Sequence, residues 1–168
     1  MEKVEFLKSV PIFSELSDDT LAQLSKSGSI QNFSKDSIIL SEKEAGSALF
    51  IITSGKVKIS RISIEDDDKE VILSILNPSD FFGEMSILDG QNRSANVVTL
   101  EDSKIMVIRR EDFLQMLHDY PQIAINLLKE LAQRLRRSDA QIKSLSLQNA
   151  TGKVASTLLR IADDSGKI

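Results

Sequence analysis

The sequence contains no cysteine and only one histidine, His118, among its 168 residues. Without cysteine the chain cannot form disulfides, offer a thiolate nucleophile or ligate an iron–sulfur cluster through thiolates. With one histidine it cannot assemble a metal site from several histidines, and its serines lack the partners of a catalytic triad. His118 precedes a predicted helix and is expected to be an ordinary, half-exposed surface residue rather than a haem or metal ligand. We therefore expect no catalytic residues, no metal site and no enzymatic activity.

Long apolar runs are also missing. None approaches the roughly 20 residues that span a bilayer, and the first six residues lack the basic-then-apolar order of a signal peptide. Apolar residues make up 41% and charged residues 27%, which is typical of a globular protein with one domain, or one domain plus an appendage. The net charge of −4 gives no overall attraction to DNA. We expect a cytoplasmic protein without membrane contact.

Residues 81–97 gather the groups needed to hold a buried phosphate and a sugar. Gly83 leaves room for a ligand to reach the backbone, and Arg93 brings a planar, permanently charged fork suited to a phosphate. Glu84 can accept a hydrogen bond from a ribose hydroxyl, and Ser94 can donate one to a phosphate oxygen. The alternative is a tight turn with a surface ion pair, but the apolar flanks favour burial, and buried charges need partners.

The segment resembles the phosphate-binding cassette of cyclic-nucleotide-binding domains, and the chain around it resembles the bacterial catabolite activator family, Crp/Fnr. In that family the Glu binds the ribose hydroxyl, while the Arg, the small hydroxyl residue and nearby amides bind the cyclic phosphate. The absence of cysteine excludes the oxygen-sensing branch of the family. The resemblance implies ligand contacts at Gly83, Glu84, Met85, Arg93, Ser94 and Ala95.

The resemblance also implies residues around the base. Ser138 and Asp139 match helix positions that touch the base from each subunit, although Asp139 stands where a hydroxyl residue is usual. A carboxylate there suits the exocyclic amine of adenine, or it faces solvent. Ile59 and Leu73 match strand positions that line the base, with a plain core role as the alternative. Arg134 lies one helical turn before Ser138, from where it can link the cassette to the helix.

Short apolar strands separated by turn-forming residues dominate the chain from residue 30 onward. Their spacing predicts an antiparallel β-roll or sandwich, and the resemblance specifies an α+β fold: a double-stranded β-helix, jelly-roll-like, with flanking N-terminal helices and a long C-terminal helix. Ser17 is the predicted N-cap of a helix within the first 24 residues. Residues 64–70 are expected to form an acidic, solvated hairpin loop. The predicted strands cover residues 37–40, 48–53, 56–62, 71–76, 95–99 and 103–109.

After Glu111 the periodicity becomes helical, and Pro121 is expected in the first turn of a long helix. Residues at alternating steps of three and four then form a heptad seam, which predicts a parallel coiled-coil homodimer. The alternative is a stripe that packs the helix on its own β-roll. Ser138 interrupts the seam, either to set its register or to meet a ligand. The apolar seam residues are Leu128, Leu131, Leu135, Ile142 and Leu145.

Three segments follow from this interpretation: a cyclic-nucleotide-binding β-roll domain at 1–119, a dimerisation helix at 120–149, and a hinge with the start of a truncated DNA-binding domain at 150–168. The hinge is expected at residues 149–153. The family's winged helix-turn-helix domain is absent from the sequence, so we expect a chain cut before that domain or a natural short form. Either would reach DNA only through the missing domain.

These features predict the ligand-sensing and dimerisation portion of a bacterial transcriptional regulator. A cyclic nucleotide, cyclic AMP rather than cyclic GMP, is expected to act as an allosteric effector that biases the geometry of a homodimer. No covalent cofactor is expected. Two alternatives remain open: a sensor of the same fold with another small effector, such as an organic acid or haem, and an effector-free dimerisation module.

Overall fold

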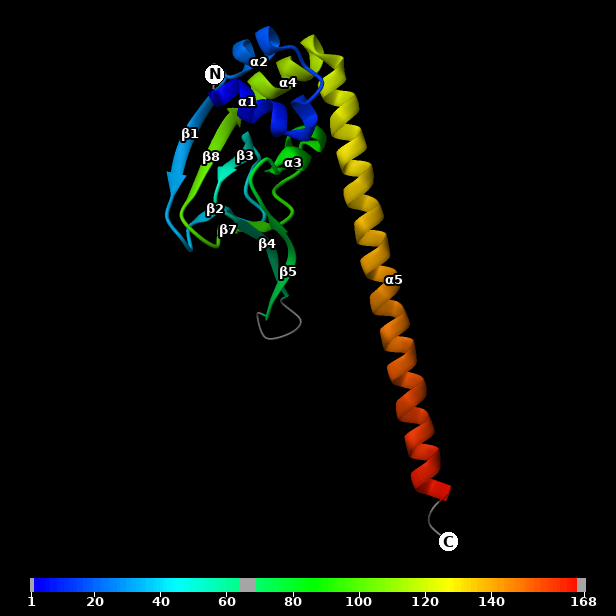
Figure 1. Ribbon diagram of the computed structural model, residues 1–168. Coiled ribbons are helices and arrows are strands. Elements are labelled where there is room, and N and C mark those ends of the chain that lie inside the picture. Colours follow the sequence, from blue (N-terminus) through cyan, green and yellow to red (C-terminus); the bar gives the residue numbers. More distant parts are fainter. Residues whose placement is uncertain (1, 64–68, 166–168) are drawn as a thin grey trace. The chain divides into compact units, whose positions relative to one another are not determined.

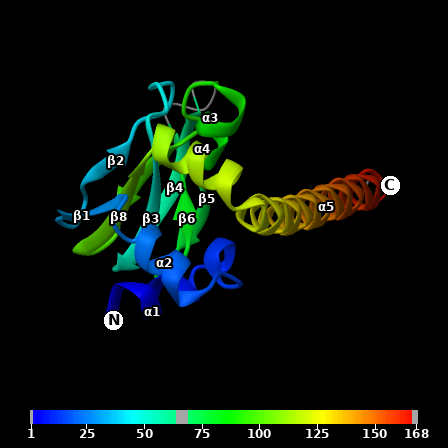
Figure 2. The ribbon, with the colours of Figure 1, turned by 90° about the horizontal axis from the view of Figure 1, so that it is seen from above.

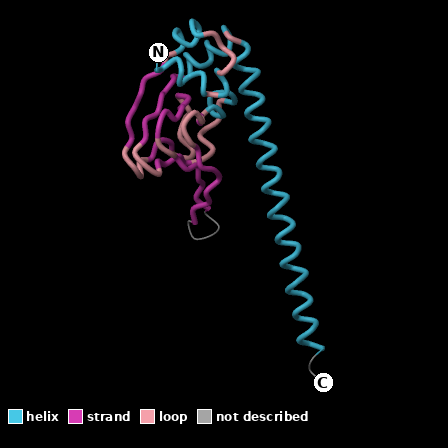
Figure 3. The backbone as a smooth tube through the Cα atoms, viewed as in Figure 1, coloured by secondary structure: helices cyan, strands magenta, loops and turns pink. Residues whose placement is uncertain are grey.

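The computed structural model describes residues 2–63 and 69–165 (Figure 1). The chain divides into two compact units, Met1–Leu127 and Leu128–Ile168. All the described strands belong to the first unit, and the described part of the second unit is helix (Figure 3). Most of the predicted acidic loop at 64–70, namely residues 64–68, lies outside the described residues.

The N-terminal helices form where the sequence supplies caps and buried apolar residues. They are α1 (Glu2–Ser9), a 3₁₀ helix η1 (Pro11–Phe13) and α2 (Asp18–Leu24). Ser17 caps α2, because its Oγ accepts a hydrogen bond of 3.3 Å from the backbone N–H of Thr20. The predicted cap is therefore confirmed. Helices α1, α2 and α4 (Arg110–Asp119) gather at one end of the strands (Figures 1 and 2).

Within residues 2–63 and 69–165, eight strands form two four-stranded antiparallel sheets, which confirms the predicted double-stranded β-roll. The first sheet has the order β1-β8-β3-β6 and the second the order β2-β7-β4-β5. The strands are β1 (Gly28–Phe33), β2 (Ile38–Leu40), β3 (Ala48–Ser54), β4 (Val57–Ser63), β5 (Lys69–Leu76), β6 (Phe81–Phe82), β7 (Asn96–Thr99) and β8 (Ser103–Arg109).

The core lies between the two sheets. Strand β3 is buried on both faces from Ala48 to Ile52, because Phe50 and Ile52 face the opposite sheet while Leu49 and Ile51 lie on the other side. Phe50 stacks on Phe82 of β6 with ring centroids 5.1 Å apart. This stack fixes β6, and therefore the start of the cassette, against the central strand.

Thr99 joins the turn before β2 to the end of β7. Its buried Oγ1 donates to the carbonyl of Ser34 at 2.7 Å and accepts from the N–H of Ser37 at 2.8 Å. Asp36 completes the turn with a left-handed φ of 62° and donates its N–H to the Thr99 carbonyl. A short polar side chain tolerates this conformation, so the turn forms without glycine.

Helix α5 (Pro121–Ser165) begins at Pro121, as expected for a residue with no N–H to lose in a first helical turn. Its first turns bury Ile123 and Leu127 within the first unit. The backbone stays helical through residues 149–153, so the hinge expected there is not a break in the helix. Gly152 lowers helix propensity but removes no hydrogen bond, which explains why the helix continues. None of the described helices has the length and apolar character needed to cross a membrane.

Candidate functional site

Arg93 points into the protein rather than into solvent. Its side chain is 4% exposed, Nη1 donates to the carbonyl of Gly83 at 2.7 Å, and Nη2 donates to the carbonyl of Ala48 at 2.9 Å. The guanidinium carbon lies 5.7 Å from the centroid of the Phe50 ring. Two backbone segments distant in sequence therefore fix one guanidinium at the inner face of the roll.

The charge of Arg93 is set by two opposing effects. Burial lowers the pKa of its guanidinium, and the negative charges of Glu84 and then Glu44 raise that pKa in part. Glu84 is itself buried, at 3% exposure. An arginine keeps its proton in proteins and has five N–H donors. Two of them reach carbonyls, and the buried Nε has no hydrogen-bond partner among the described residues. The site thus retains donors that suit an anion.

Gly83 is required by the close approach of Arg93. It has a left-handed φ of 86° immediately before α3 (Glu84–Asp89), where a side chain is strained. A Cβ on Gly83 would lie 2.8 Å from Nη1 of Arg93 and 3.0 Å from the Ala48 carbonyl oxygen. The sequence suggests that this glycine leaves room for a ligand. The structure shows the guanidinium of Arg93 against it instead.

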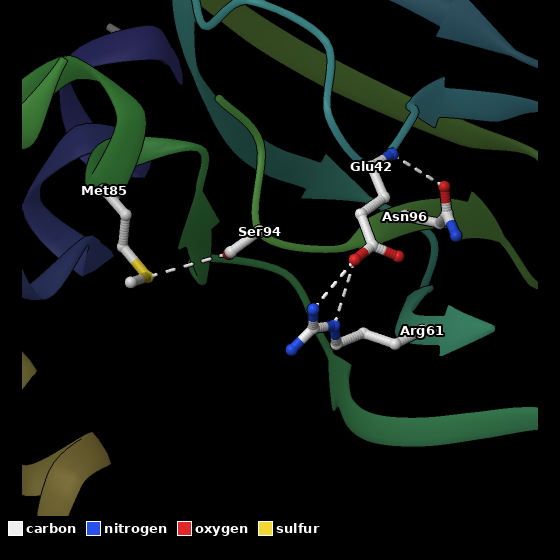
Figure 4. A network of polar contacts seen from close by, with 5 residues as sticks. All are labelled: Glu42, Arg61, Met85, Ser94 and Asn96. Carbon is white, nitrogen blue, oxygen red and sulfur yellow. Dashed lines mark hydrogen bonds and ion pairs between the residues drawn. The ribbon is translucent and has the colours of Figure 1, made fainter. Parts of the chain in front are cut away.

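The other cassette residues differ in their exposure. Ser94 is exposed, and its Oγ donates to the sulfur of Met85 at 3.9 Å (Figure 4). Sulfur is a weak acceptor, so this hydroxyl can exchange it for a stronger one at little cost. Met85 is 52% exposed, and Ala95 is buried. An exposed hydroxyl therefore follows the buried arginine directly along the chain, in contact with an exposed apolar side chain of α3.

A second guanidinium, that of Arg61, is drawn in the same view as Ser94 and is not among the residues predicted from the sequence (Figure 4). Arg61 donates from Nε and Nη2 to Oε1 of Glu42 at 3.1 and 2.9 Å (Figure 4). The backbone N–H of Glu42 donates to Oδ1 of Asn96 at 2.8 Å. The sequence does contain one signal for Arg61. Every second residue of a strand lies on the same face, so Arg61 shares a face of β4 with Val57 and Ile59.

The two residues expected to line a base lie on neighbouring strands. Ile59 is partly buried and packs against the core between the sheets, while Leu73 is 47% exposed. Strand pairing runs from Ile59 with Ser74 to Ser60 with Ile72, which leaves Leu73 as the extra residue of a bulge. Ile59 therefore has a core role, and the contact of either residue with a base stays a prediction.

Ser138, Asp139, Arg134 and the predicted seam lie on α5 in the second unit. The Ser138 Oγ donates to the Arg134 carbonyl at 3.1 Å. Most seam side chains are strongly exposed in the single chain, and Leu131 is partly buried. Their contacts with a ligand or a second copy stay predictions. The exposed fractions are 66% for Leu128, 63% for Leu135, 62% for Ile142 and 60% for Leu145.

His118 is more exposed than the half-exposed residue expected. Its side chain is 85% exposed, and Nδ1 lies 3.1 Å from Oδ1 of Asp119. It lies in the last turn of α4, which ends at Asp119, so little packs on it. Over the described residues, no group of three or more histidines and carboxylates is arranged to hold a metal ion.

Comparison with known proteins gives a consistent set of matches. The family model described as "Cyclic nucleotide-binding domain" matches residues 30–120, more than half of the chain. A CRP-like cAMP-activated global transcriptional regulator of Mycobacterium tuberculosis is 35% identical over 96% of this chain and 71% of its own length. A cyclic AMP receptor protein of Thermus thermophilus is 37% identical over 73% of this chain.

The fold matches as well. The crystal structure of Thermus thermophilus catabolite activator protein superposes with a TM-score of 0.73 at 33% identity, over 81% of this chain. The aligned part covers 63% of that crystallised chain and 56% of the Thermus thermophilus cyclic AMP receptor protein. The chain thus spans roughly three fifths of these two proteins.

Proposed function

The chain belongs to the cyclic nucleotide-binding domain family, among the CRP-like regulators, and from this premise we propose that it senses a cyclic nucleotide, with cyclic AMP preferred over cyclic GMP. One observation carries the proposal: Arg93 is buried, charged and fixed by two carbonyls, yet keeps donors for an anion. A surface ion pair would not need a guanidinium at 4% exposure. A phosphate that enters beside Arg93 would supply the missing acceptor.

Each cassette residue has a distinct part in binding. Arg93 and Ser94 hold the cyclic phosphate, since one offers charged donors and the other a hydroxyl with only a sulfur acceptor nearby. The backbone near Ala95 supplies N–H groups. Glu84 accepts from the ribose hydroxyl, and its charge also stabilises the protonated Arg93. Met85 covers the ligand from α3. These roles need no covalent chemistry, so we propose a non-enzymatic sensor.

Signal transmission uses helix α5. We propose that two copies pair through the exposed seam residues, because apolar side chains at 60–66% exposure along one stripe lose water when they pair. Ser138 and Asp139 then meet the base, with Arg134 as a link to the cassette. A ligand shifts a two-state equilibrium only by its difference in affinity for the states, and a nearly complete switch takes about 5.5 kcal/mol.

The biological role follows from the relatives, whose names describe cAMP-activated transcriptional regulators. We propose that this chain is the sensing and dimerisation part of such a regulator in the bacterial cytoplasm. DNA contacts belong to a separate domain.

Calorimetric titration with cyclic AMP and cyclic GMP tests the proposal. We expect binding of both, tighter for cyclic AMP, and a loss of about 10- to 100-fold in Arg93→Gln, because hydrogen bonds to charged groups contribute about 1.5–3 kcal/mol. Arg109→Gln is the matched control, since Arg109 is 76% exposed and its side chain pairs with Asp112 rather than with a cassette residue. Ser94→Ala is a second probe that leaves the buried network intact. Absence of heat with either nucleotide would refute the proposal.

A further inference from the structure

Arg61 lies beside the phosphate-binding segment. It shares a face of β4 with Ile59, and the next residue of the ladder, Ser60, pairs with Asn96 of β7. Arg61 follows Ser60 along β4, and Ala95 precedes Asn96 at the start of β7, so both residues adjoin the last pair of this ladder. Figure 4 shows its guanidinium on the side of the strand where Ser94 lies. A second cation therefore stands at the edge of the proposed phosphate site.

The partner of Arg61 is held more firmly than Arg61 itself. The Glu42 side chain is 17% exposed, whereas that of Arg61 is 58% exposed. The Asn96 side chain anchors the Glu42 backbone. Two N–H groups of Arg61 converge on one carboxylate oxygen, at 3.1 and 2.9 Å. A non-bridging phosphate oxygen accepts the same two donors, so Oε1 of Glu42 occupies the chemical role of such an oxygen.

The carboxylates near Arg93 explain why a second cation would favour phosphate binding. Glu84 and Glu44 act on Arg93, and their negative charges favour its protonated form. An incoming phosphate therefore meets two carboxylates as well as one guanidinium, and like charges repel most strongly where water is excluded. A guanidinium that moves from Glu42 toward the phosphate offsets this repulsion. If the ion pair only held the loop that precedes β3 against strand β4, it would not offset this repulsion.

We propose that Arg61 is a specificity-determining residue for anionic ligands, which exchanges the carboxylate of Glu42 for a non-bridging oxygen of the cyclic phosphate. This inference rests on the proposed function, because the anion is the phosphate that Arg93 binds. The contact selects for the phosphate and is indifferent to the base. Glu42 keeps Arg61 in place in the ligand-free protein and competes with the ligand for it.

Two single substitutions test the exchange, because it predicts that they change nucleotide affinity in opposite directions. Arg61→Gln removes a ligand contact, so affinity for cyclic AMP and cyclic GMP falls by roughly three- to tenfold, in the range of partly exposed charge pairs. Glu42→Gln removes the competitor, so affinity for both nucleotides rises by roughly two- to fivefold. Arg109→Gln makes the same charge change at an exposed pair elsewhere and should leave affinity within about twofold. Titrations at two salt concentrations show whether the Arg61 effect is electrostatic.

Four outcomes decide the matter. The exchange is supported if affinity falls in Arg61→Gln and rises in Glu42→Gln, and if each change is the same for cyclic AMP and cyclic GMP. Shifts in the same direction mean that the pair only supports the loop, and they overturn the inference while the proposed function stands. If Arg61→Gln changes the ratio of the affinities for cyclic AMP and cyclic GMP, Arg61 contacts the base instead of the phosphate. This result also overturns the inference. A wild-type chain that binds neither nucleotide refutes the proposed function, and the exchange with it.

Discussion

Replacement of Gly83 by alanine tests directly how tightly the backbone is fitted around Arg93. The new methyl carbon would lie 2.8 Å from Nη1 of Arg93 and 3.0 Å from the Ala48 carbonyl oxygen. The Ala48 carbonyl belongs to a central strand and cannot yield, so the guanidinium must move. Its 2.7 Å hydrogen bond to the Gly83 carbonyl is then lost or lengthened. We expect both stability and nucleotide affinity to fall.

Gly90 provides the matched control for this change. It ends the same short helix with a similar left-handed φ of 70°, but a Cβ there meets nothing within 4 Å. Alanine in that conformation costs about 1–2 kcal/mol at either position. At Gly83 the displaced bond to a charged donor adds about 1.5–3 kcal/mol. The difference in free energy of unfolding between the two variants therefore isolates the displacement of Arg93.

Thermal unfolding and calorimetric titration together measure this difference. A chain of this size loses about 3 °C per kcal/mol, so Gly83→Ala should melt about 5–9 °C below Gly90→Ala. Its affinity for cyclic AMP should fall by at least about tenfold if one charged hydrogen bond to the ligand is disturbed, while Gly90→Ala binds as the parent does. Equal melting temperatures and equal affinities for the two variants would refute the reasoning, because the guanidinium would then not depend on the empty space at Gly83.

Three further predictions concern other parts of the chain. Thr99→Val removes the hydroxyl that bonds both the Ser34 carbonyl and the Ser37 N–H and should cost about 1–3 kcal/mol in urea unfolding, since each hydrogen bond contributes about 0.5–1.5 kcal/mol; a cost near zero would contradict the role given to the Thr99 hydroxyl. The pKa of Glu70 lies below its ordinary value, chiefly because Lys58 hydrogen-bonds to it. The stabilisation from this pair is therefore complete above the ordinary pKa and lost as pH falls through the lowered one, and an NMR titration in Lys58→Met should show the pKa of Glu70 raised toward its ordinary value. Ile142→Glu should sediment as a monomer, whereas Ser144→Glu, which lies off the seam, should stay dimeric. If both variants sediment as dimers, the seam does not hold the dimer together.

The parts of the fold that could be predicted are those with a regular pattern. Strand β3 is a nearly continuous apolar run that is buried from Ala48 to Ile52, and β4 begins with apolar Val57 and Ile59 at alternate positions. Turn-forming residues frame each strand, so their positions follow from the sequence. Strand β1 carries mostly exposed residues and exists through its pairing with β8, which leaves no alternation to detect. Strand β6 has two residues, too few for any period, and its place depends on the stack of Phe82 on Phe50.

The site divides in a similar way. The residue types of the cassette are visible in the sequence because glycine, glutamate, arginine and serine stand close together along the chain. The partners of Arg93 are not, since the Ala48 carbonyl lies 45 residues away and any residue type could supply it. The pair of Glu42 and Arg61 joins residues 19 apart on a loop and a strand, and nothing in the local sequence of either residue marks the pairing. Sequence therefore indicates the ligand, and packing decides which groups meet it.

The central claim is that Arg93 binds the phosphate of a cyclic nucleotide, and a binding cycle of protein and ligand tests it most directly. Cyclic AMP and adenosine share base and ribose but differ in the phosphate, so their affinities are measured by calorimetry for the parent chain and for Arg93→Gln. We expect the parent chain to prefer cyclic AMP by about 10- to 100-fold and most of this preference to disappear in the variant. A preference that survives unchanged in a folded Arg93→Gln chain would contradict the central claim.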